Sequence, residues 1–151
     1  MDAFDRRLLM LLQANNQQTH EQLGNQLGLS ATAVRRRVQR LRTEGIIRAD
    51  VSLVEPSTVG ISIIVSIRFE KESNATYAAF KRRVMAMPQV AQCYTVAGDV
   101  DFILICHFPD VKSYDHWVQT ELLADTAVAR STANIVYQTV KFDTSVHVAD
   151  A

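Results

Sequence analysis

Apolar residues recur every three to four positions through the first 45 residues, which is the period of amphipathic helices. The pattern predicts three helices, over residues 2–14, 19–27 and 30–44. Thr19 and Gln22 have the spacing of a capping box, which places the start of the second helix. The short turn GLS separates the second helix from the third, so this pair is predicted to form a helix-turn-helix.

Residues 46–54 continue with alternating apolar positions, which predicts a short hairpin or wing. The next six residues, EPSTVG, contain a proline and a glycine and are interpreted as a linker between domains. We therefore expect a winged helix-turn-helix domain over residues 1–54 and a linker over residues 55–60.

The apolar pattern changes after the linker. It predicts two strands around a turn in the middle of the segment, with a helix on either side and a strand at each end. The expected elements are a strand over 61–69, a helix over 74–87, two strands within 89–108, a helix capped by Asp110 and a last strand over 133–148. This order is that of a ferredoxin-like domain, expected over residues 61–151. The predicted fold class is α+β.

The composition is that of an ordinary globular protein, with 48% hydrophobic and 21% charged residues. No apolar run reaches the roughly 20 residues that span a bilayer, and the N-terminus lacks the features of a signal peptide. The four histidines and two cysteines show no metal-ligand spacing, so we expect a cytoplasmic protein without metal or cofactor. Pairing of strands about the turn at 98–101 would put Cys93 opposite Cys106, as two buried apolar residues or as a redox pair.

Positive charge is concentrated in one segment, although the chain has 16 basic and 16 acidic residues. Residues 29–45 read LSATAVRRRVQRLRTEG and contain five arginines and one acid. On a helix, Val34, Val38 and Leu41 lie within about 60° of one another and form an apolar stripe. The arginines and threonines lie opposite this stripe or at its edges, which is the arrangement of a DNA-recognition helix.

The candidate DNA contacts divide by their position on this helix. Thr32 and Arg36, near its start and opposite the apolar stripe, are candidates for contacts with base edges. The other candidates, which suit phosphates or flank the recognition face, are Ser30, Arg35, Arg37, Arg40 and Arg48. Two alternatives remain: an arginine-rich face that is merely solvated, and a winged helix that binds proteins and has no salt-dependent affinity for DNA.

Two further segments, AGDVDFIL at 97–104 and VARSTANIVYQTVK at 128–141, follow in the order and spacing of a known family. With the helix-turn-helix segments they resemble the Lrp/AsnC (leucine-responsive and asparagine regulator) transcription regulators over nearly the whole chain. The resemblance implies double-stranded DNA as a partner and a small effector, usually an amino acid, bound by the second domain. It also implies homodimers that assemble into octamers.

The resemblance places the effector site at a turn and on the last strand. The matching residues are Gly98, Asp99, Val100, Asp101 and Ser131. A glycine lets the backbone approach a ligand closely, and a carboxylate can pair with an α-ammonium group; an ordinary Gly-Asp hairpin turn is the alternative. The chain departs from the family at Ala133, where a threonine is usual, and at Arg35, where a small or apolar residue is usual.

An enzyme is the alternative function. Some relatives with the same two-domain layout resemble tetrapyrrole (siroheme-type) decarboxylases. The arginine-rich third helix favours the regulator, because a decarboxylase needs no DNA-reading surface.

Overall fold

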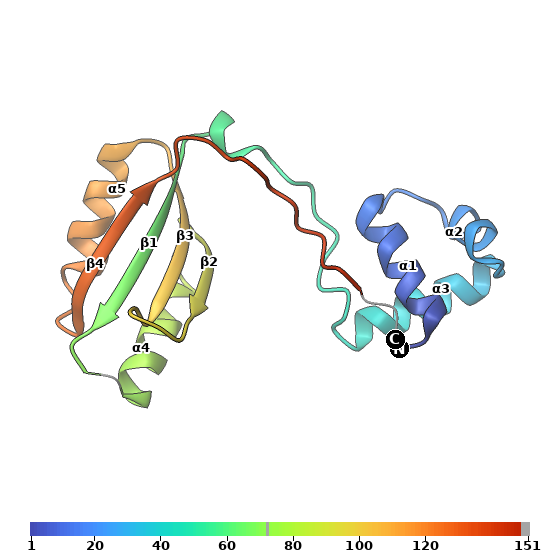
Figure 1. Cartoon of the computed structure of the whole chain (residues 1–151), viewed down its shortest axis with the longest axis horizontal. Coiled ribbons are helices and arrows are strands. Elements are labelled where there is room, and N and C mark those ends of the chain that lie inside the picture. The colour runs from blue at the N-terminus through green and yellow to red at the C-terminus, as the bar shows by residue number, and fades with distance from the viewer. Residues whose placement is uncertain (72, 149–151) are drawn as a thin grey trace. The chain divides into compact units, whose positions relative to one another are not determined.

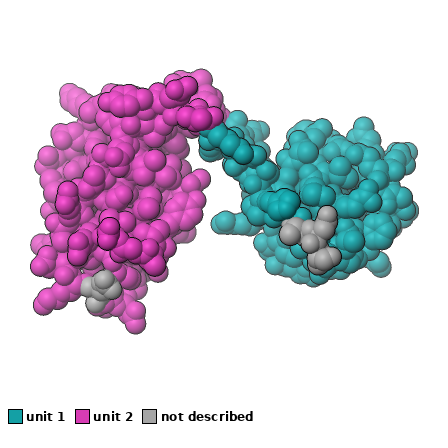
Figure 2. All heavy atoms as spheres, in the orientation of Figure 1, with its two compact units in different colours: residues 1–53, 141–151 teal, residues 54–140 magenta. Residues whose placement is uncertain are grey.

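The computed structural model describes residues 1–71 and 73–148, which fold as two compact units (Figures 1 and 2). The first unit contains residues 1–53 and the C-terminal segment from Lys141, and the second contains residues 54–140. The C-terminal segment thus lies in the unit with the N-terminus, although the sequence pattern assigned it to the second domain.

Three helices form the first unit, as the sequence predicts: α1 (Ala3–Ala14), α2 (His20–Leu27) and α3 (Ala31–Thr43). The Thr19–Gln22 capping box begins α2, and Ser30 caps α3 by accepting a hydrogen bond from the Ala33 N–H. The helices bury one apolar cluster, whose members are Leu8, Leu9, Leu23, Leu27, Val34, Val38 and Leu41.

The turn between α2 and α3 depends on two glycines. Gly28 ends α2 in the left-handed conformation, at a φ of 68°. Gly24 packs so closely that a Cβ atom there would lie 2.5 Å from the Leu29 carbonyl oxygen. The close approach fixes how α3 leaves α2 and therefore which face of α3 is outermost.

The expected wing over residues 46–54 is wrong, because this segment contains no strand. Val51, Leu53 and Val54 are exposed, so the alternating apolar positions do not face a core. Within the described part of the first unit no other segment forms a strand, and an isolated strand without a partner leaves its backbone groups unpaired. An ion pair between Arg42 and Asp50, with a separation of 2.5 Å, ties the segment to α3 instead.

The second unit is a four-stranded antiparallel sheet with helices on one face (Figure 1). Its elements are the 3-10 turn η1 (Pro56–Thr58), β1 (Ile61–Phe69), α4 (Asn74–Val84), β2 (Val90–Thr95), β3 (Phe102–Phe108), α5 (Val111–Trp117), the π-helical turn η2 (Val118–Leu122) and β4 (Val128–Ile135). The strand order is β2-β3-β1-β4. This confirms the ferredoxin-like order predicted from the sequence.

Alternate residues of the central strands face the helices. On β1 these are Ile63, Val65, Ile67 and Phe69, which are buried together with Phe80 of α4 and Trp117 of α5 in one core. The intervening positions of β1 and β3 are at most half-buried. One face of the sheet is therefore covered within the chain and the other is open.

The last strand differs from its prediction in extent. It runs over Val128–Ile135 and not over residues 133–148. Its partner β1 begins at Ile61, and the last bond between these segments joins the Val136 N–H to the Ser62 carbonyl oxygen at 2.9 Å. Beyond that point no partner strand remains, so the apolar residues that follow leave the sheet.

The predicted pairing of the two cysteines is also wrong. Cys93 lies opposite Leu104, and Cys106 lies opposite Val90, because the register shifts between Val90 and Gln92. Burial raises the pKa of the Cys106 thiol to about 12, and the nearby Cys93 contributes in the same direction. A thiol with so high a pKa is held as a small apolar residue.

Candidate DNA and effector sites

The outward face of α3 carries side chains that are free to contact another molecule. Thr32, Arg35 and Arg36 are exposed, and within the described residues neither arginine forms an ion pair. Behind them Val34 and Val38 are buried in the helical core, so the face cannot turn inward. The first turn of α3 contains no acidic residue, which leaves its N-terminal dipole uncompensated and attractive to anions.

Arg37 and Arg40 form ion pairs with acidic residues of the same unit. Arg37 donates to Asp2 at 2.7 Å and to Asp5 at 2.8 Å, and its side chain is 21% exposed. Arg40 reaches the other oxygen of Asp5 at 2.5 Å and lies 3.7 Å from Glu44. These two arginines join α3 to α1, and the phosphate contacts expected of them stay a prediction.

Asp5 is the centre of this network. Its side chain is 1% exposed, and it also accepts a hydrogen bond from the Asp2 N–H as part of the α1 capping box. Burial alone would raise the pKa of Asp5, but the Asp2 N–H and the two guanidinium groups outweigh it and hold the pKa below its usual value. Hydrogen bonds to the side chains of Asp2 and Asp5 raise the pKa of Arg37. The carboxylate therefore stays charged and bound in the folded unit.

The other candidate DNA contacts lie at the two ends of α3. Ser30 is exposed, and its hydroxyl oxygen is already an acceptor for the Ala33 N–H. Arg48 is exposed in the extended segment after α3. Ser30 directly precedes α3, Arg48 follows its last residue, Thr43, within the next segment, and neither is buried.

The predicted effector loop joins β2 to β3 at one end of the sheet. Gly98 and Asp99 are exposed, Val100 is half-buried, and Gly98 has a φ of 152°, which favours glycine. Among the described residues, no hydrogen bond involves the backbone N–H groups of residues 98–100. The loop thus presents free N–H donors beside the Asp99 carboxylate.

Asp101 faces the protein and not the solvent. It is 9% exposed. One carboxylate oxygen accepts the Phe69 N–H at 2.7 Å and the other accepts the Tyr77 hydroxyl, while its own N–H donates to the Ile67 carbonyl oxygen at 2.8 Å. Asp101 therefore anchors the loop to β1 and α4, and Asp99 is the carboxylate that a ligand can reach.

Ser131 reaches the same end of the sheet from another strand. On β4 it pairs with Ile67 of β1, which in turn pairs with Phe102 of β3, the residue after the loop. The three residues form one row across the sheet, with β1 between Ser131 and the loop. Neighbouring strands are about 4.8 Å apart, so the loop and Ser131 are roughly 10 Å apart in one chain.

The open face of the sheet carries an apolar centre. Ile64 pairs with Ile105, and both are half-buried, as is Ile103 beside them. Ser62 and His107 form a hydrogen bond of 2.9 Å next to this patch. In the part of the chain that the structure describes, no element packs over this face.

Neither a metal site nor a membrane span is found among the described residues. No group of three or more histidine, cysteine, aspartate or glutamate side chains is arranged to hold an ion. No described helix combines the length and the apolar character that crossing a bilayer requires.

Both units match models of known domains. Residues 1–42 match the AsnC-type helix-turn-helix domain, and residues 62–146 match the Lrp/AsnC ligand binding domain. The chain belongs to the Lrp/AsnC family of transcription regulators. A family member consists of a helix-turn-helix for DNA and a ligand-binding domain, which are the two units of the fold.

Individual relatives support the assignment of this Lrp/AsnC chain. It is 40% identical to the HTH-type transcriptional regulator y4tD of Sinorhizobium fredii, over 79% of the chain and 72% of the relative. It is 34% identical to a glutamate uptake regulatory protein of Zymomonas mobilis, over 76% of the chain and 71% of the relative. The structure of the regulator NMB0573 of Neisseria meningitidis in complex with L-methionine has a TM-score of 0.85, at 27% identity and with 97% and 96% of the two chains covered.

The sequence pattern did not predict the roles of Asp2, Asp5 and Tyr77. Asp2 and Asp5 have the three-residue spacing of a capping box, which could have marked the start of α1. Nothing in the sequence shows that Asp5 also receives Arg37 and Arg40, because these lie more than 30 residues away. The bond of Tyr77 to Asp101 likewise depends on how α4 crosses the sheet.

We predict that Asp5→Asn destabilises the Lrp/AsnC chain at neutral pH by about 1–3 kcal/mol, because two charged hydrogen bonds lose their ionised acceptor. The pKa of Asp5 is lowered in the folded state, so its contribution is present above the unfolded pKa of about 3.9 and is lost as pH falls through the folded value. Urea unfolding followed by circular dichroism should show a gap between the two proteins at pH 7 that narrows below pH 4.

Asp115→Asn, at an exposed position of α5, is the matched control and should leave stability nearly unchanged at both pH values. An Asp5→Asn variant as stable as the unaltered chain at pH 7 would show that the network contributes nothing.

Proposed function

We propose that this regulator binds its operator through the outward face of α3 and responds to an amino acid held by the loop between β2 and β3. The observation that carries the DNA site is the exposure of Arg35, Arg36 and Thr32 on a helix whose opposite face is buried. Arg36 and Thr32 contact base edges, since they lie near the start of the helix that enters the major groove.

The remaining basic residues have separate roles in this proposal. Arg35, Arg48 and the Ser30 hydroxyl contact phosphates, which position the helix without reading sequence. Arg37 and Arg40 set the orientation of α3, because their guanidinium groups are bound to Asp5. Their net charge toward DNA is correspondingly reduced by the carboxylates beside them.

The effector is an amino acid in this proposal, bound at Gly98, Asp99 and Val100. The exposed Asp99 carboxylate suits an α-ammonium group, and the free N–H groups of the loop suit a carboxylate. Asp101 holds the loop in place from below. The complex of the Neisseria meningitidis regulator with L-methionine supports this class of ligand.

Ser131 lies on the far side of β1 from the loop in its own chain, so its contribution to this site comes from a second chain. At roughly 10 Å from the loop along the row of strands it cannot touch the same groups of a small ligand within one chain. A neighbouring subunit whose β4 approaches the loop would bring the hydroxyl to the ligand. The effector then binds between subunits, so its binding shifts the assembly equilibrium if it prefers one assembly.

Homodimers form through the open face of the sheet in this proposal, and further contacts between dimers produce the octamer. A sheet with helices on one side leaves its other side to be covered by a second layer. The half-buried Ile64, Ile103 and Ile105 supply an apolar centre for that layer. A two-fold dimer would place two copies of α3 on half-sites about one helical turn of DNA apart.

We infer that the chain is a regulator and not a tetrapyrrole decarboxylase. The inference is supported by the exposed arginine face of α3 and by the transcription regulators among its relatives. Incubation of the purified chain with a siroheme-type tetrapyrrole should leave the visible absorption spectrum of the pigment unchanged. A progressive spectral change with release of carbon dioxide would establish the enzyme instead.

We predict that Arg36→Ala weakens binding to the chain's own operator by about 1–3 kcal/mol and relaxes the sequence preference, because a base contact is lost. The neighbouring Arg35→Ala should weaken binding to operator and random duplexes alike and reduce the salt slope by about one unit. Fluorescence anisotropy over a series of salt concentrations measures both effects. Equal losses on the two duplexes for both variants would show that α3 does not read bases.

We predict that Asp99→Asn and Gly98→Ala remove binding of the amino acid effector, because one loses the partner of the ammonium group and the other strains the loop. Calorimetry with each of the twenty amino acids identifies the effector in the unaltered chain, and the variants are then titrated with it. Asp115→Asn is the control and should bind normally. Unchanged affinity in both loop variants would place the effector elsewhere.

We predict that Ile105→Lys disrupts assembly, because a charge would be buried at the centre of the interface between two sheets. Light scattering should show a multiple of the 16.9 kDa chain mass for the unaltered protein and mainly the monomer for the variant. Val111→Lys, at an exposed position of α5, should leave the mass unchanged. An unaltered protein that is monomeric at micromolar concentration would exclude the dimer.

A further inference from the structure

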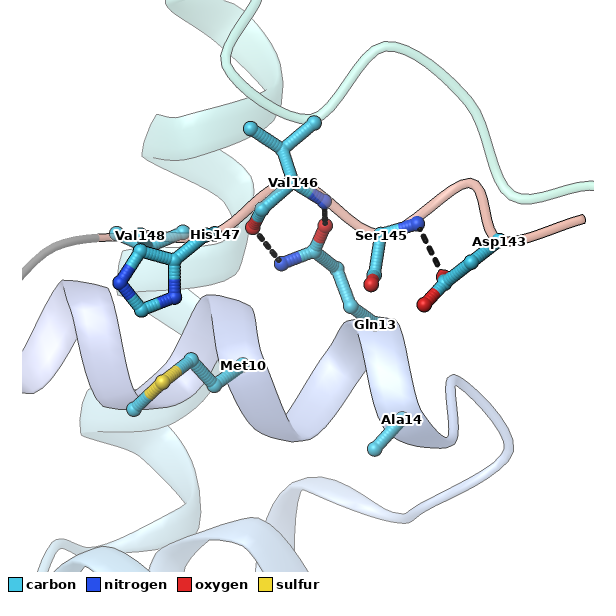
Figure 3. A pocket seen from close by; sticks show the side chains of 8 residues that line it. All are labelled: Met10, Gln13, Ala14, Asp143, Ser145, Val146, His147 and Val148. Carbon is cyan, nitrogen blue, oxygen red and sulfur yellow. Dashed lines mark hydrogen bonds between the residues drawn. The ribbon is translucent and has the colours of Figure 1, made fainter. Parts of the chain in front are cut away.

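The C-terminal segment is docked on α1, where the Gln13 side chain forms hydrogen bonds with the backbone of the segment (Figure 3). The Gln13 side-chain oxygen accepts the Val146 N–H at 2.6 Å, and its amide nitrogen donates to the Val146 carbonyl oxygen at 3.1 Å. Both backbone groups of one residue are thus satisfied by one side chain. A neighbouring β-strand would satisfy them in the same way.

Further contacts hold the segment on either side of this pair. Val148 packs against the apolar cluster of the three helices, and Asp143 accepts the Ser145 N–H at 2.8 Å, which shapes the approach to α1. A hollow of about 380 Å³ lies between α1 and the segment, bordered by Met10 and His147 (Figure 3). The dock therefore recognises an extended peptide mainly through its backbone and one apolar side chain.

The connection at the other end of this segment is also defined. The start of β1 and the end of β4 are paired, with Ile63 opposite Ile135, so the chain enters and leaves the sheet at the same end. One connection runs through residues 54–60 and the other through residues 136–140. When the C-terminal segment is docked, both connections lead to the helix-turn-helix unit.

We propose that the surface of α1 around Gln13 is a docking site for the chain's own C-terminal segment, residues 141–148. Docking attaches the DNA-binding unit to the regulatory unit by two chain segments, and release leaves one. The doubly attached unit has fewer orientations available to it. The docked state therefore restricts the spacing of half-sites that an assembly can bind, without altering the surface that contacts DNA.

The dock is weak enough to open. It consists of two hydrogen bonds and one half-buried valine, and residues 141–147 are otherwise exposed. A free peptide would bind such a site with a dissociation constant of ~1 mM, but a tethered one experiences an effective concentration of ~10 mM. The segment is then docked about ten times as often as it is free, and a modest change in either connection can shift this balance.

Hydrogen exchange of the full-length chain tests the dock at the bond that defines it. The Val146 N–H should exchange about tenfold more slowly in the unaltered chain than in Gln13→Ala, since its acceptor is the Gln13 oxygen. The control is Gln17→Ala, which removes an exposed glutamine just after α1 whose side chain, among the described residues, forms a hydrogen bond only to Asn16. Fast exchange of peptides containing Val146 in all three proteins would overturn the proposal, whereas faster exchange confined to Gln13→Ala would support it.

A cross-link decides whether the docked segment belongs to the same chain. Met10→Cys and His147→Cys, which border the same hollow and leave Gln13 in place, are combined with Cys93→Ser, so that the exposed native thiol does not react. A short bismaleimide should join the two new thiols within one chain, seen as an internally linked monomer on a denaturing gel. A covalent dimer as the main product would assign the segment to a second copy and overturn the proposal as stated.

The consequence for DNA binding rests on the proposed function, and its measurement is separate. Gln13→Ala should bind one half-site with unchanged affinity, and it should tolerate changes in the spacing of two half-sites better than the unaltered chain by about tenfold, the ratio of docked to free segment. Identical spacing profiles would overturn the role of the second attachment even if exchange confirmed the dock. If Gln13→Ala lost affinity for a single half-site, as Arg36→Ala is expected to, the substitution would have damaged the DNA surface. This result would equally overturn the role of the second attachment.

Discussion

A buried carboxylate determines how the DNA-binding unit presents its recognition helix. Asp5 belongs to the capping box of α1, yet its oxygens also receive Arg37 and Arg40 of α3. A buried charge without partners would be costly, so the carboxylate requires these donors. Satisfying them rotates α3 until two arginines face α1, and the same rotation turns Arg35 and Arg36 outward. The internal pairing and the external surface are therefore two results of one constraint.

The regulatory unit uses a carboxylate in the same way. Asp101 accepts the Phe69 N–H and the Tyr77 hydroxyl, which joins the end of β3 to β1 and α4. The loop before it is thereby held on a rigid base while Gly98 and Asp99 remain exposed. In both units a buried acidic residue, of a type usually found at the surface, holds in place the elements that form the surface proposed for binding. The exposed residues proposed to contact a ligand are Asp99, near Asp101 in the loop, and Arg36, beside Arg37 on α3.

The topology of the sheet determines how the two units can communicate. Because β1 and β4 are paired at the end where the chain enters and leaves, a change in that pairing acts on both connections together. Ser131 and Ile67 lie in the row nearest the effector loop, at the opposite end of the same two strands. Both strands thus run between the loop proposed to bind the effector and the two connections, which would give an effector bound there a continuous structural route toward the DNA-binding unit. Such a route becomes a mechanism of coupling only through two states of different affinity.

The local pattern of the sequence determined the helices, the caps, the order of helices and strands along the chain and the division of α3 into an apolar and an arginine-rich face, because these depend on period and on residues a few positions apart. It did not determine the partners of Arg37, Arg40 and Asp101, since each partner comes from another element and only packing brings them together. The wing and the long last strand failed for the same reason: alternating residues form a strand only where a second backbone is present to pair with. The register of Cys93 and Cys106 depended on a bulge that the turn between them does not encode, and the dock at Gln13 depended on the chain returning to its first helix.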